Sequence, residues 1–243
     1  MKKLVIDIGN TIAKSAEILE EEVGELSYWD NPNELSDYIN KSGFDRIGIS
    51  SVVSRENEIL EHISSEIDVL TLTSQTPLPI KLHYNTKETL GVDRIAGVCG
   101  AFDLFPGKDC LVIDIGTCIT CDFLDKEGLY HGGVISPGLD IRLKGMHQYT
   151  GKLPLIEMKE ISGDISIVGK STFDCMKSGA YNGILMELSG FIDHFSEKYQ
   201  GINIIMTGGD SYRFESLINR PIFVVPKLVL QGLNCILNYN EEL

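Results

Sequence analysis

The chain has 243 residues, an apolar fraction of 43% and a formal net charge of −14. A chain of this length can form two domains of roughly 110 to 130 residues each. Its acidity argues against broad binding to nucleic acid or to an anionic membrane, because both partners require basic surface, although an anionic nucleotide could bind locally.

The first half of the chain predicts alternating strands and helices, as in α/β proteins. The predicted elements are a strand at 3–7, two neighbouring meander strands at 12–19 and 23–28, a helix at 33–41, a strand at 46–52, a helix with Ser54 as N-cap, and a strand at 68–72. The segment 74–87 contains Pro77 and Pro79 and little periodicity. It is therefore predicted to be a linker or a crossing loop before a helix at about 92–105.

The second half begins with the same order of strands as the first. The predicted elements are strands at 110–115, 119–124 and 129–135 with turns at 125–128 and 136–138, helices at 139–149 and 171–200, a strand at 203–206, a turn at 208–210, a short helix, a strand at 222–225 and a final helix at 227–239. The long helix suits either a bridge between domains or subunits, or the core of one domain. The period of its apolar residues shows that one face is buried but not which element covers that face.

A hexapeptide, Leu-Val-Ile-Asp-Ile-Gly, occurs at 4–9 and again at 111–116. Each copy predicts a buried strand that delivers a carboxylate, Asp7 or Asp114, to a tight turn. Backbone N–H groups at such a turn, beside the hydroxyl of Thr11 or Thr117, form a concave donor surface suited to phosphate oxygens. Apolar strands also recur by chance, but the similar residues that follow the two copies favour a duplicated domain.

The cysteines and histidines predict no metal or redox centre. Six scattered cysteines, without a signal segment or an apolar run of about 18 residues, favour a cytoplasmic protein with free thiols. Cys118 and Cys121 have the spacing of a redox or metal pair, but residues three apart in a strand point to opposite faces, which favours a structural role. The five histidines have no ligand spacing with one another.

Polar, glycine-rich stretches interrupt the α/β pattern at the predicted turns. They are Asp7-Ile8-Gly9-Asn10-Thr11, Gly91-Val92-Asp93-Arg94, Asp114-Ile115-Gly116-Thr117, Gly132-Gly133-Val134-Ile135-Ser136-Pro137-Gly138 and Gly208-Gly209-Asp210. Each stretch alone is a weak signal, because turns favour these residue types for conformational reasons. The first four in this order, with Tyr84 ahead of the second, resemble the type III pantothenate kinases. This family belongs to the superfamily of acetate and sugar kinases, heat-shock chaperones and actin, and the resemblance covers nearly the whole chain.

The resemblance implies an α/β fold with two ribonuclease-H-like domains of duplicated topology, here 1–108 and 109–243, and ATP in the cleft between them. It implies ATP-dependent phosphorylation of pantothenate to 4'-phosphopantothenate, the first step of coenzyme A biosynthesis. Phosphoryl transfer depends mainly on positioning and on neutralising charge. Gly9, Asn10 and Thr11 would hold the terminal phosphates, with Asp7 beside them to position a weakly held Mg²⁺ or its water shell.

Asp93 is the predicted general base. A carboxylate beside a glycine turn and an arginine can accept the proton of a hydroxyl, while Arg94 binds anionic oxygen. The residues alone favour an ordinary Asp-Arg pair at a helix start, where a carboxylate stabilises the N-terminus. The family resemblance favours the catalytic role.

The resemblance also implies the remaining site residues. Asp114 would bind a monovalent cation, K⁺ or NH₄⁺, since hard oxygen ligands suit such ions, and Gly116 and Thr117 would face the nucleotide phosphates. The pantothenate pocket would be lined by Tyr84, Gly91, Val92, Asp93 and Arg94, and by Thr172 from the partner subunit of a homodimer.

The chain departs from the family pattern at two positions. Ile12 stands where a polar or basic residue is frequent, which leaves Lys14 as the nearest candidate cation for the phosphates, although a strand lysine is often only solvated. Cys118 replaces a usual alanine and is little larger. The alternative functions are a kinase of another small alcohol, against which the stretch from Gly91 to Arg94 argues, and a non-catalytic nucleotide-binding regulator, against which Asp7, Asp93 and Asp114 argue.

Overall fold

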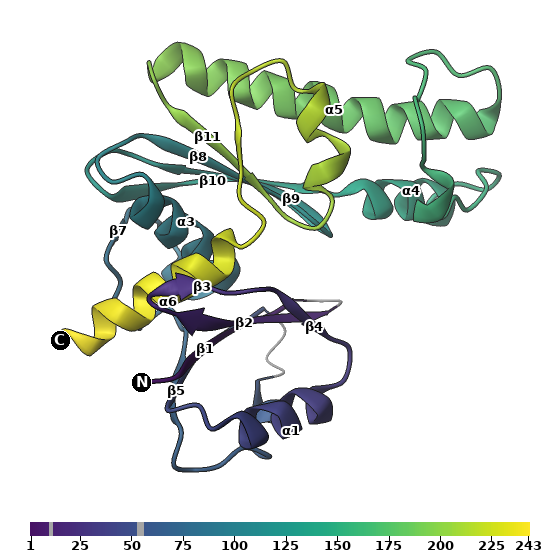
Figure 1. The fold of residues 1–243 in the computed structure, drawn as a ribbon. Helices are drawn as coiled ribbons and strands as arrows, with labels where there is room; N and C mark the ends of the chain where they lie inside the picture. The colour runs from purple at the N-terminus through teal and green to yellow at the C-terminus, as the bar shows by residue number, and fades with distance from the viewer. Residues whose placement is uncertain (10–11, 53–55) are drawn as a thin grey trace. The chain divides into compact units, whose positions relative to one another are not determined.

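The computed structural model describes residues 1–9, 12–52 and 56–243, which form two compact units (Figure 1). The first unit comprises Met1–Cys110, Asp122–Gly132 and Lys227–Leu243, and the second comprises Leu111–Cys121 and Gly133–Pro226. The division into domains at residues 108 and 109 stays a prediction. Within the described residues, no helix is both long and apolar enough to cross a membrane.

The first sheet has the strand order β3-β2-β1-β5-β6, with β4 paired to β2. Its strands are β1 (Lys3–Ile8), β2 (Ala13–Leu19), β3 (Glu22–Val23), β4 (Ser27–Trp29), β5 (Arg46–Ser51) and β6 (Asp68–Thr71). β1 is antiparallel to β2 and parallel to β5, which is parallel to β6. The mostly apolar sequence of β1 reflects its burial at the centre of this sheet.

Helices cover both faces of the first sheet. Helix α1 (Pro32–Ser42) begins after Asn31, whose side chain accepts the N–H of Asn33, and its buried Leu35 and Ile39 pack with the apolar residues of β1 and β5. The short α2 (Asn57–Leu60) adds Ile59 to the same cluster. On the other face, α6 (Leu228–Glu241) lies so close that a Cβ at Gly48 of β5 would approach Leu237 to 2.9 Å.

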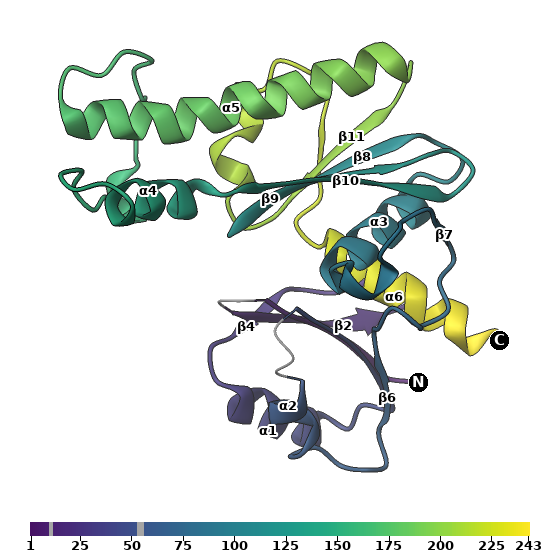
Figure 2. The same ribbon diagram turned by 180° about the vertical axis from the view of Figure 1, so that it is seen from behind.

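Two helices of the first unit, α3 (Val92–Leu104) and α6, pack side by side, as both views show (Figure 2). Their close approach depends on glycine. A Cβ at Gly232 would collide with the carbonyl oxygen of Ala96, and one at Gly100 with that of Leu228. The position of α3 in the first unit is therefore set by a backbone-to-backbone contact that admits no side chain.

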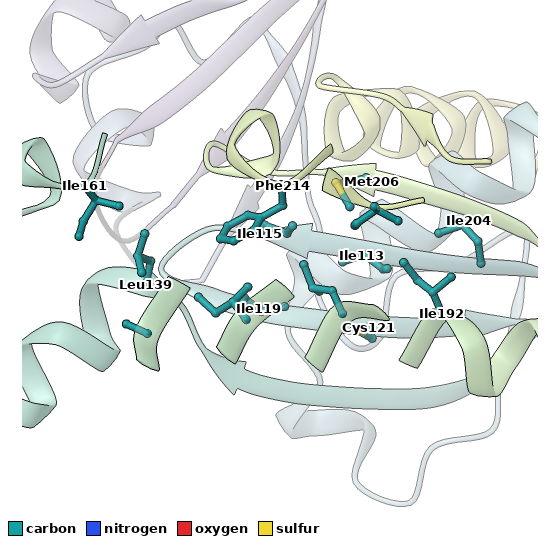
Figure 3. Close-up of a cluster of buried hydrophobic side chains, with 14 of the residues drawn as sticks. Ile113, Ile115, Ile119, Cys121, Leu139, Ile161, Ile192, Ile204, Met206 and Phe214 are labelled. Carbon is teal, nitrogen blue, oxygen red and sulfur yellow. The ribbon is translucent and has the colours of Figure 1, made fainter. Parts of the chain in front are cut away.

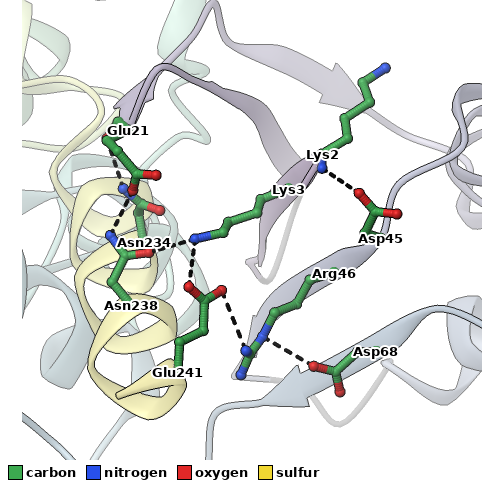
Figure 4. Close-up of polar contacts among 9 residues, drawn as sticks. All are labelled: Lys2, Lys3, Glu21, Asp45, Arg46, Asp68, Asn234, Asn238 and Glu241. Atoms are coloured by element: carbon green, nitrogen blue, oxygen red, sulfur yellow. Dashed lines mark hydrogen bonds and ion pairs between the residues drawn. The ribbon is translucent and has the colours of Figure 1, made fainter.

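A buried lysine ties the end of α6 to the first sheet (Figure 4). Lys3 Nζ donates to Asn238 Oδ1 and to Glu241 Oε2, each at 2.9 Å, and only 8% of the lysine side chain is exposed. Glu241 also pairs with Arg46, which pairs with Asp68 on the neighbouring strand. This network lies at the ends of β1 and β5 that are opposite to Asp7 and Ser50.

The second sheet repeats the connectivity of the first. Its order is β12-β11-β8-β9-β10-β7, with β7 (Lys81–Leu82), β8 (Cys110–Ile115), β9 (Cys118–Leu124), β10 (Leu129–Pro137), β11 (Asn203–Thr207) and β12 (Phe223–Val224). Within it, β8 has the next strand β9 on one side and β11 on the other, just as β1 lies between β2 and β5, and β7 is an additional strand at the β10 edge. The two hexapeptides thus occupy the corresponding strands β1 and β8, as the sequence repeat predicts.

The core of the second unit lies between the sheet and helices α4 (Leu139–Gln148) and α5 (Thr172–Lys198) (Figure 3). The apolar residues on the buried face of α5 recur at every fourth position: Met176, Ala180, Ile184, Leu188 and Ile192. This face packs with Ile113, Ile119 and other strand residues of the same unit. The long helix is therefore a core helix of one unit, one of the two alternatives that its sequence allowed.

Several predicted elements differ from the structure. The strand predicted at 23–28 is two short strands, β3 and β4, which pair with successive parts of β2. The predicted linker 74–87 contains β7, whose parallel pairing with β10 is not visible in local sequence. The predicted turn at 136–138 begins later, since β10 continues to Pro137. The short helix after residue 210 is two 3₁₀ turns, Ser211–Arg213 and Glu215–Leu217, and further 3₁₀ turns lie at Lys87–Thr89 and Met158–Glu160. The predicted N-cap Ser54 lies outside the described residues.

Candidate active site

Gly91 and Asp93 shape the start of helix α3. Gly91 is the N-cap, Val92 is the first helical residue, and Asp93 Oδ1 accepts the backbone N–H of Arg94 at 2.8 Å. This bond satisfies one of the N–H groups that a helix start leaves without a partner. A Cβ at Gly91 would lie 2.6 Å from Asp93 Oδ1, so the missing side chain leaves room for the folded-back carboxylate.

The Asp93 carboxylate is a better proton acceptor than an ordinary aspartate. Burial raises its pKa, and the negative charge of Asp122 adds to this rise, whereas the N–H and the positive charge of Arg94 oppose it. The net direction is upward. A raised pKa brings a carboxylate closer to the range in which a general base works well at neutral pH.

Arg94 is held by a buried carboxylate that sequence analysis did not identify. Its Nε lies 3.0 Å from Asp122 Oδ1, and its Nη2 donates to the same oxygen at 2.5 Å. The hydroxyl of Tyr130 donates to that oxygen at 2.6 Å. Arg94 is 8% exposed and Asp122 is 1% exposed. The available signal was Asp122 itself, an ionisable residue in an apolar strand, since such groups are rarely buried unless they are paired.

Tyr84 stands beside this buried group. Its ring stacks on that of Tyr130 with 6.1 Å between the centroids and an interplanar angle of 24°. Gly132 adopts φ +89°, and a Cβ there would lie 3.4 Å from the Tyr84 ring. The glycine therefore supplies both the backbone conformation and the space that Tyr84 needs. Tyr84, Arg94 and the start of α3 form one neighbourhood within the first unit.

Asp7, at the end of β1, shares an electrostatic environment with Asp93. Burial raises the pKa of Asp7, and the negative charge of Asp93 raises it further. Two partners act in the opposite direction: Ser50 Oγ donates to Asp7 Oδ1 at 2.6 Å, and Lys14 lies opposite Asp7 in the antiparallel register of β1 and β2. Lys14 is therefore placed beside the carboxylate that is predicted to position Mg²⁺ or its water shell.

The turn after β1 is described only in part. The Gly9 N–H donates to the Ile12 carbonyl oxygen at 3.2 Å. A Cβ at Gly9 would lie 3.2 Å from that oxygen, so this position accommodates a larger residue poorly. Asn10 and Thr11, both predicted to contact phosphate, lie outside the described residues.

In the second unit, the turn after β8 is enclosed by glycines. The Gly116 N–H donates to the Cys118 carbonyl oxygen at 2.9 Å, and the Gly138 N–H donates to the Thr117 carbonyl oxygen at 3.0 Å. A Cβ at Gly138 would collide with the Gly116 carbonyl oxygen. The start of α4 thus packs directly on the backbone of the Gly116–Thr117 turn.

Asp114 lies beside the glycine turn that follows β11. Gly208 has φ +95°, and a Cβ there would lie 2.5 Å from Asp114 Oδ1. The Asp210 N–H donates to the Ile115 carbonyl oxygen at 2.9 Å, which fixes this turn against the end of β8. The Gly208-Gly209-Asp210 stretch therefore acts as a support for the Asp114 turn.

The predicted site residues divide between the two units. Asp7, Gly9, Lys14, Tyr84 and the stretch Gly91–Arg94 belong to the first unit, whereas Asp114, Gly116, Thr117 and Thr172 belong to the second. Thr172 is the exposed first residue of α5, after the N-cap Ser171. Their roles stay predictions.

Cys118 is exposed and Cys121 is buried, although both lie on the same strand. This difference in exposure agrees with the opposite strand faces expected for the pair. Among residues 1–9, 12–52 and 56–243, no three His, Cys, Asp or Glu side chains are grouped so that they could hold a metal ion.

Solved structures show the fold class. A Campylobacter jejuni protein proposed to be a conserved Baf family transcriptional activator superposes with a TM-score of 0.66 at 20% identity, covering 99% of this chain and 100% of the other. The activator of the 2-hydroxyisocaproyl-CoA dehydratase from Clostridium difficile, solved with bound ADPNP, gives a TM-score of 0.56 at 14% identity, covering 100% and 98%. The chain therefore shares the α/β fold of these two proteins, which agrees with the fold class that its sequence predicted.

Sequence relatives then define the family. The family description "Type III pantothenate kinase" matches residues 3–194. A protein of that name from Bacteroides fragilis is 43% identical over 241 residues, which cover 98% of both chains. The chain belongs to the type III pantothenate kinase family, and the resemblance read from its motifs is confirmed.

Proposed function

We propose that the protein catalyses the ATP-dependent phosphorylation of pantothenate to 4'-phosphopantothenate, the first step of coenzyme A biosynthesis. Membership of the family supports this reaction. The observation that carries it in the structure is the start of α3, where the carboxylate of Asp93 has a raised pKa and lies next to a buried arginine. This combination suits an acceptor for a hydroxyl proton beside a group that binds anionic oxygen.

The residues of the first unit account for the acceptor side of the reaction. Asp93 takes the proton of the pantothenate hydroxyl as its oxygen attacks the γ-phosphorus of ATP, and the bond to the leaving ADP breaks. Arg94, Tyr84, Gly91 and Val92 position pantothenate. Such positioning supplies most of the catalysis in phosphoryl transfer, because the reaction needs little covalent help from the protein.

The turn after β1 contacts the transferring phosphate. Gly9, Asn10 and Thr11 provide donors, and Lys14, opposite Asp7 in the register, provides positive charge. Asp7 positions a weakly held Mg²⁺ or its water shell. Its hydrogen bond from Ser50 holds one carboxylate oxygen in a fixed direction, as a positioning role requires.

In the second unit, Gly116 and Thr117 face the nucleotide phosphates, and Asp114 binds a monovalent cation, K⁺ or NH₄⁺. The donor chemistry fits such an ion: the Asp114 carboxylate and the carbonyl oxygens of Gly116 and Thr117 are hard ligands. The glycines at 138 and 208 keep the space beside these oxygens free of side chains. Bound there, the ion would offset the negative charge of the phosphates.

A homodimer would complete the pantothenate pocket with Thr172. Support comes from large apolar side chains that are exposed near the head of α5 and along it. Ile167 is 59% exposed, Val168 is 69% exposed and Met186 is 62% exposed. Contiguous exposed apolar patches mark sites of protein association, and Ile167 and Val168 are adjacent in the chain. The cytoplasmic location expected from the free cysteines is part of the same proposal.

A substrate panel tests the proposed function. The purified full chain is incubated with Mg-ATP, in K⁺ or Na⁺, and with pantothenate or one of several sugars and small alcohols, and ADP release is measured. We expect turnover with pantothenate and a faster rate in K⁺. Faster turnover with a sugar than with pantothenate would identify the protein as a kinase of another alcohol. ATP binding without turnover on any acceptor would favour a nucleotide-binding regulator.

A further inference from the structure

The most completely buried carboxylate near Asp93 is Asp122, in the middle of β9. One of its oxygens, Oδ1, receives Arg94 Nε at 3.0 Å, Arg94 Nη2 at 2.5 Å and the Tyr130 hydroxyl at 2.6 Å. The other oxygen, Oδ2, lies 3.2 Å from Arg94 Nε. The Asp122 carboxylate therefore accepts hydrogen bonds from two nitrogens of the Arg94 guanidinium. The Tyr130 hydroxyl, on β10, donates a further hydrogen bond to it.

Fold stability alone is a weak reason for such a pair. Removing two charges from water costs nearly as much as their attraction returns, and well-packed apolar residues usually serve a core as well or better. A bidentate carboxylate does, however, fix the plane of a guanidinium, whose long side chain otherwise samples many rotamers. Fixed orientation is what a substrate-binding arginine needs.

We propose that Asp122, held by Tyr130, is a positioning residue of the acceptor site, which fixes the guanidinium of Arg94 beside Asp93 and balances its positive charge. Asp122 acts through Arg94 and contacts no substrate in this scheme. The inference rests on the proposed function for its kinetic consequences, but the arrangement of the three side chains has consequences that are measurable without turnover.

The charges around Asp93 give the direction of the effect. The groups that act on it are Asp122 and Asp7, both negative, and Arg94, which is positive. Tyr130 stays protonated, because burial and the charge of Asp122 raise its pKa. Removing the charge of Asp122 leaves Arg94 uncompensated, and both changes lower the pKa of Asp93. The acid limb of the kcat/KM profile should therefore move to lower pH.

The principal variant is Asp122→Asn, which keeps the shape and removes the charge. We expect the KM for pantothenate to rise by about tenfold or more, with a smaller fall in kcat, because a loosely held Arg94 binds the acceptor less well. The KM for ATP should change by less than about twofold. A second variant, Tyr130→Phe, removes one hydrogen bond without burying a new polar group, and should raise the KM for pantothenate by about threefold.

Lys3→Met is the matched control. Lys3 forms another buried ion pair in the same unit, at the opposite end of β1 from Asp7. Its loss should lower the melting temperature and leave both the KM for pantothenate and the pH profile unchanged. If Asp122→Asn behaves like this control, Asp122 has only a structural role and the inference is wrong.

An NMR titration of the Asp93 carboxyl carbon, whose signal is assigned by comparison with Asp93→Asn, tests the role of Asp122 without a measurement of activity. Asp122→Asn should shift this titration to lower pH, whereas Lys3→Met should not. An unmoved titration overturns the inference, even in an active enzyme. If Asp122→Asn does not fold, an unchanged KM for pantothenate in Tyr130→Phe has the same consequence. A parent protein that does not phosphorylate pantothenate refutes the proposed function instead, and the titration still tests Asp122.

Discussion

Replacing Asp93 with asparagine should make the protein less active and more stable. Asparagine keeps an oxygen that can accept the Arg94 N–H but accepts no proton from a hydroxyl. Loss of a general base lowers rates by about 10² to 10⁴-fold, so we expect kcat to fall by at least about 10²-fold, or about 2.7 kcal/mol in activation free energy. ATP binding should remain nearly intact, because Asp93 faces the acceptor in the proposed mechanism.

The gain in stability follows from the raised pKa of Asp93, which burial causes first and Asp122 second. Because its folded-state pKa lies above the unfolded value, the parent loses stability as pH rises from about 4 through the folded pKa. The Asp93→Asn variant does not lose this stability, because asparagine has no carboxyl group to titrate. Each unit of pKa difference is worth about 1.4 kcal/mol, or about 3 to 6 °C in a protein of this length.

Thermal unfolding of both proteins from pH 4 to pH 8, together with single-turnover kinetics at saturating ATP, measures both effects. The two melting temperatures should converge near pH 4 and separate above it. Asp37→Asn, which alters an exposed helical carboxylate, should change neither quantity appreciably. Parental kcat in Asp93→Asn would remove Asp93 from its role as base, and a melting difference that does not vary with pH would refute the electrostatic argument.

Three further predictions concern other parts of the chain. Asp114→Ala should weaken ATP binding and abolish stimulation by K⁺, and an unchanged ratio of rates in K⁺ and Na⁺ would contradict the cation assignment. Gly232→Ala should destabilise the protein by about 1 to 3 kcal/mol in denaturant unfolding, because its Cβ meets the Ala96 carbonyl oxygen, whereas Gly190→Ala, with nothing within 4 Å, should cost nothing. Mixing inactive Asp93→Asn with inactive Thr172→Trp should restore some activity, because one site of a mixed dimer then has both native residues. No recovery after confirmed subunit exchange would place the whole pocket in one chain.

Much of the fold is predictable because its signals are local. The strands β1 and β8 have nearly continuous apolar sequences, and α5 repeats its apolar positions over 27 residues, so their existence and order follow from short windows. The two-residue strand β7 is different. It exists only because its backbone pairs with β10, nearly 50 positions away, and a two-residue run has no period of its own.

The part of the candidate site that lies in sequence motifs was predictable. The turns around Asp7, Asp93 and Asp114 contain glycines, and these mark the turns in the sequence. Asp122 and Tyr130 lie on neighbouring strands, and Arg94 lies on a helix. No rule of sequence spacing therefore predicts that these three side chains lie together. Family resemblance adds expected roles to motif residues, whereas the buried partners that hold them follow from the packing of the individual chain.

In the proposed function, this chain transfers the γ-phosphoryl group of ATP to pantothenate. The most direct test is ³¹P NMR of a reaction that contains the purified protein, Mg-ATP, K⁺ and pantothenate, with mass spectrometry of the product. We expect a new phosphomonoester signal on the primary hydroxyl of pantothenate, formed in equal amount with ADP and absent with Asp93→Asn over the same time. Release of inorganic phosphate without this ester, or no consumption of ATP while the nucleotide binds, would contradict it.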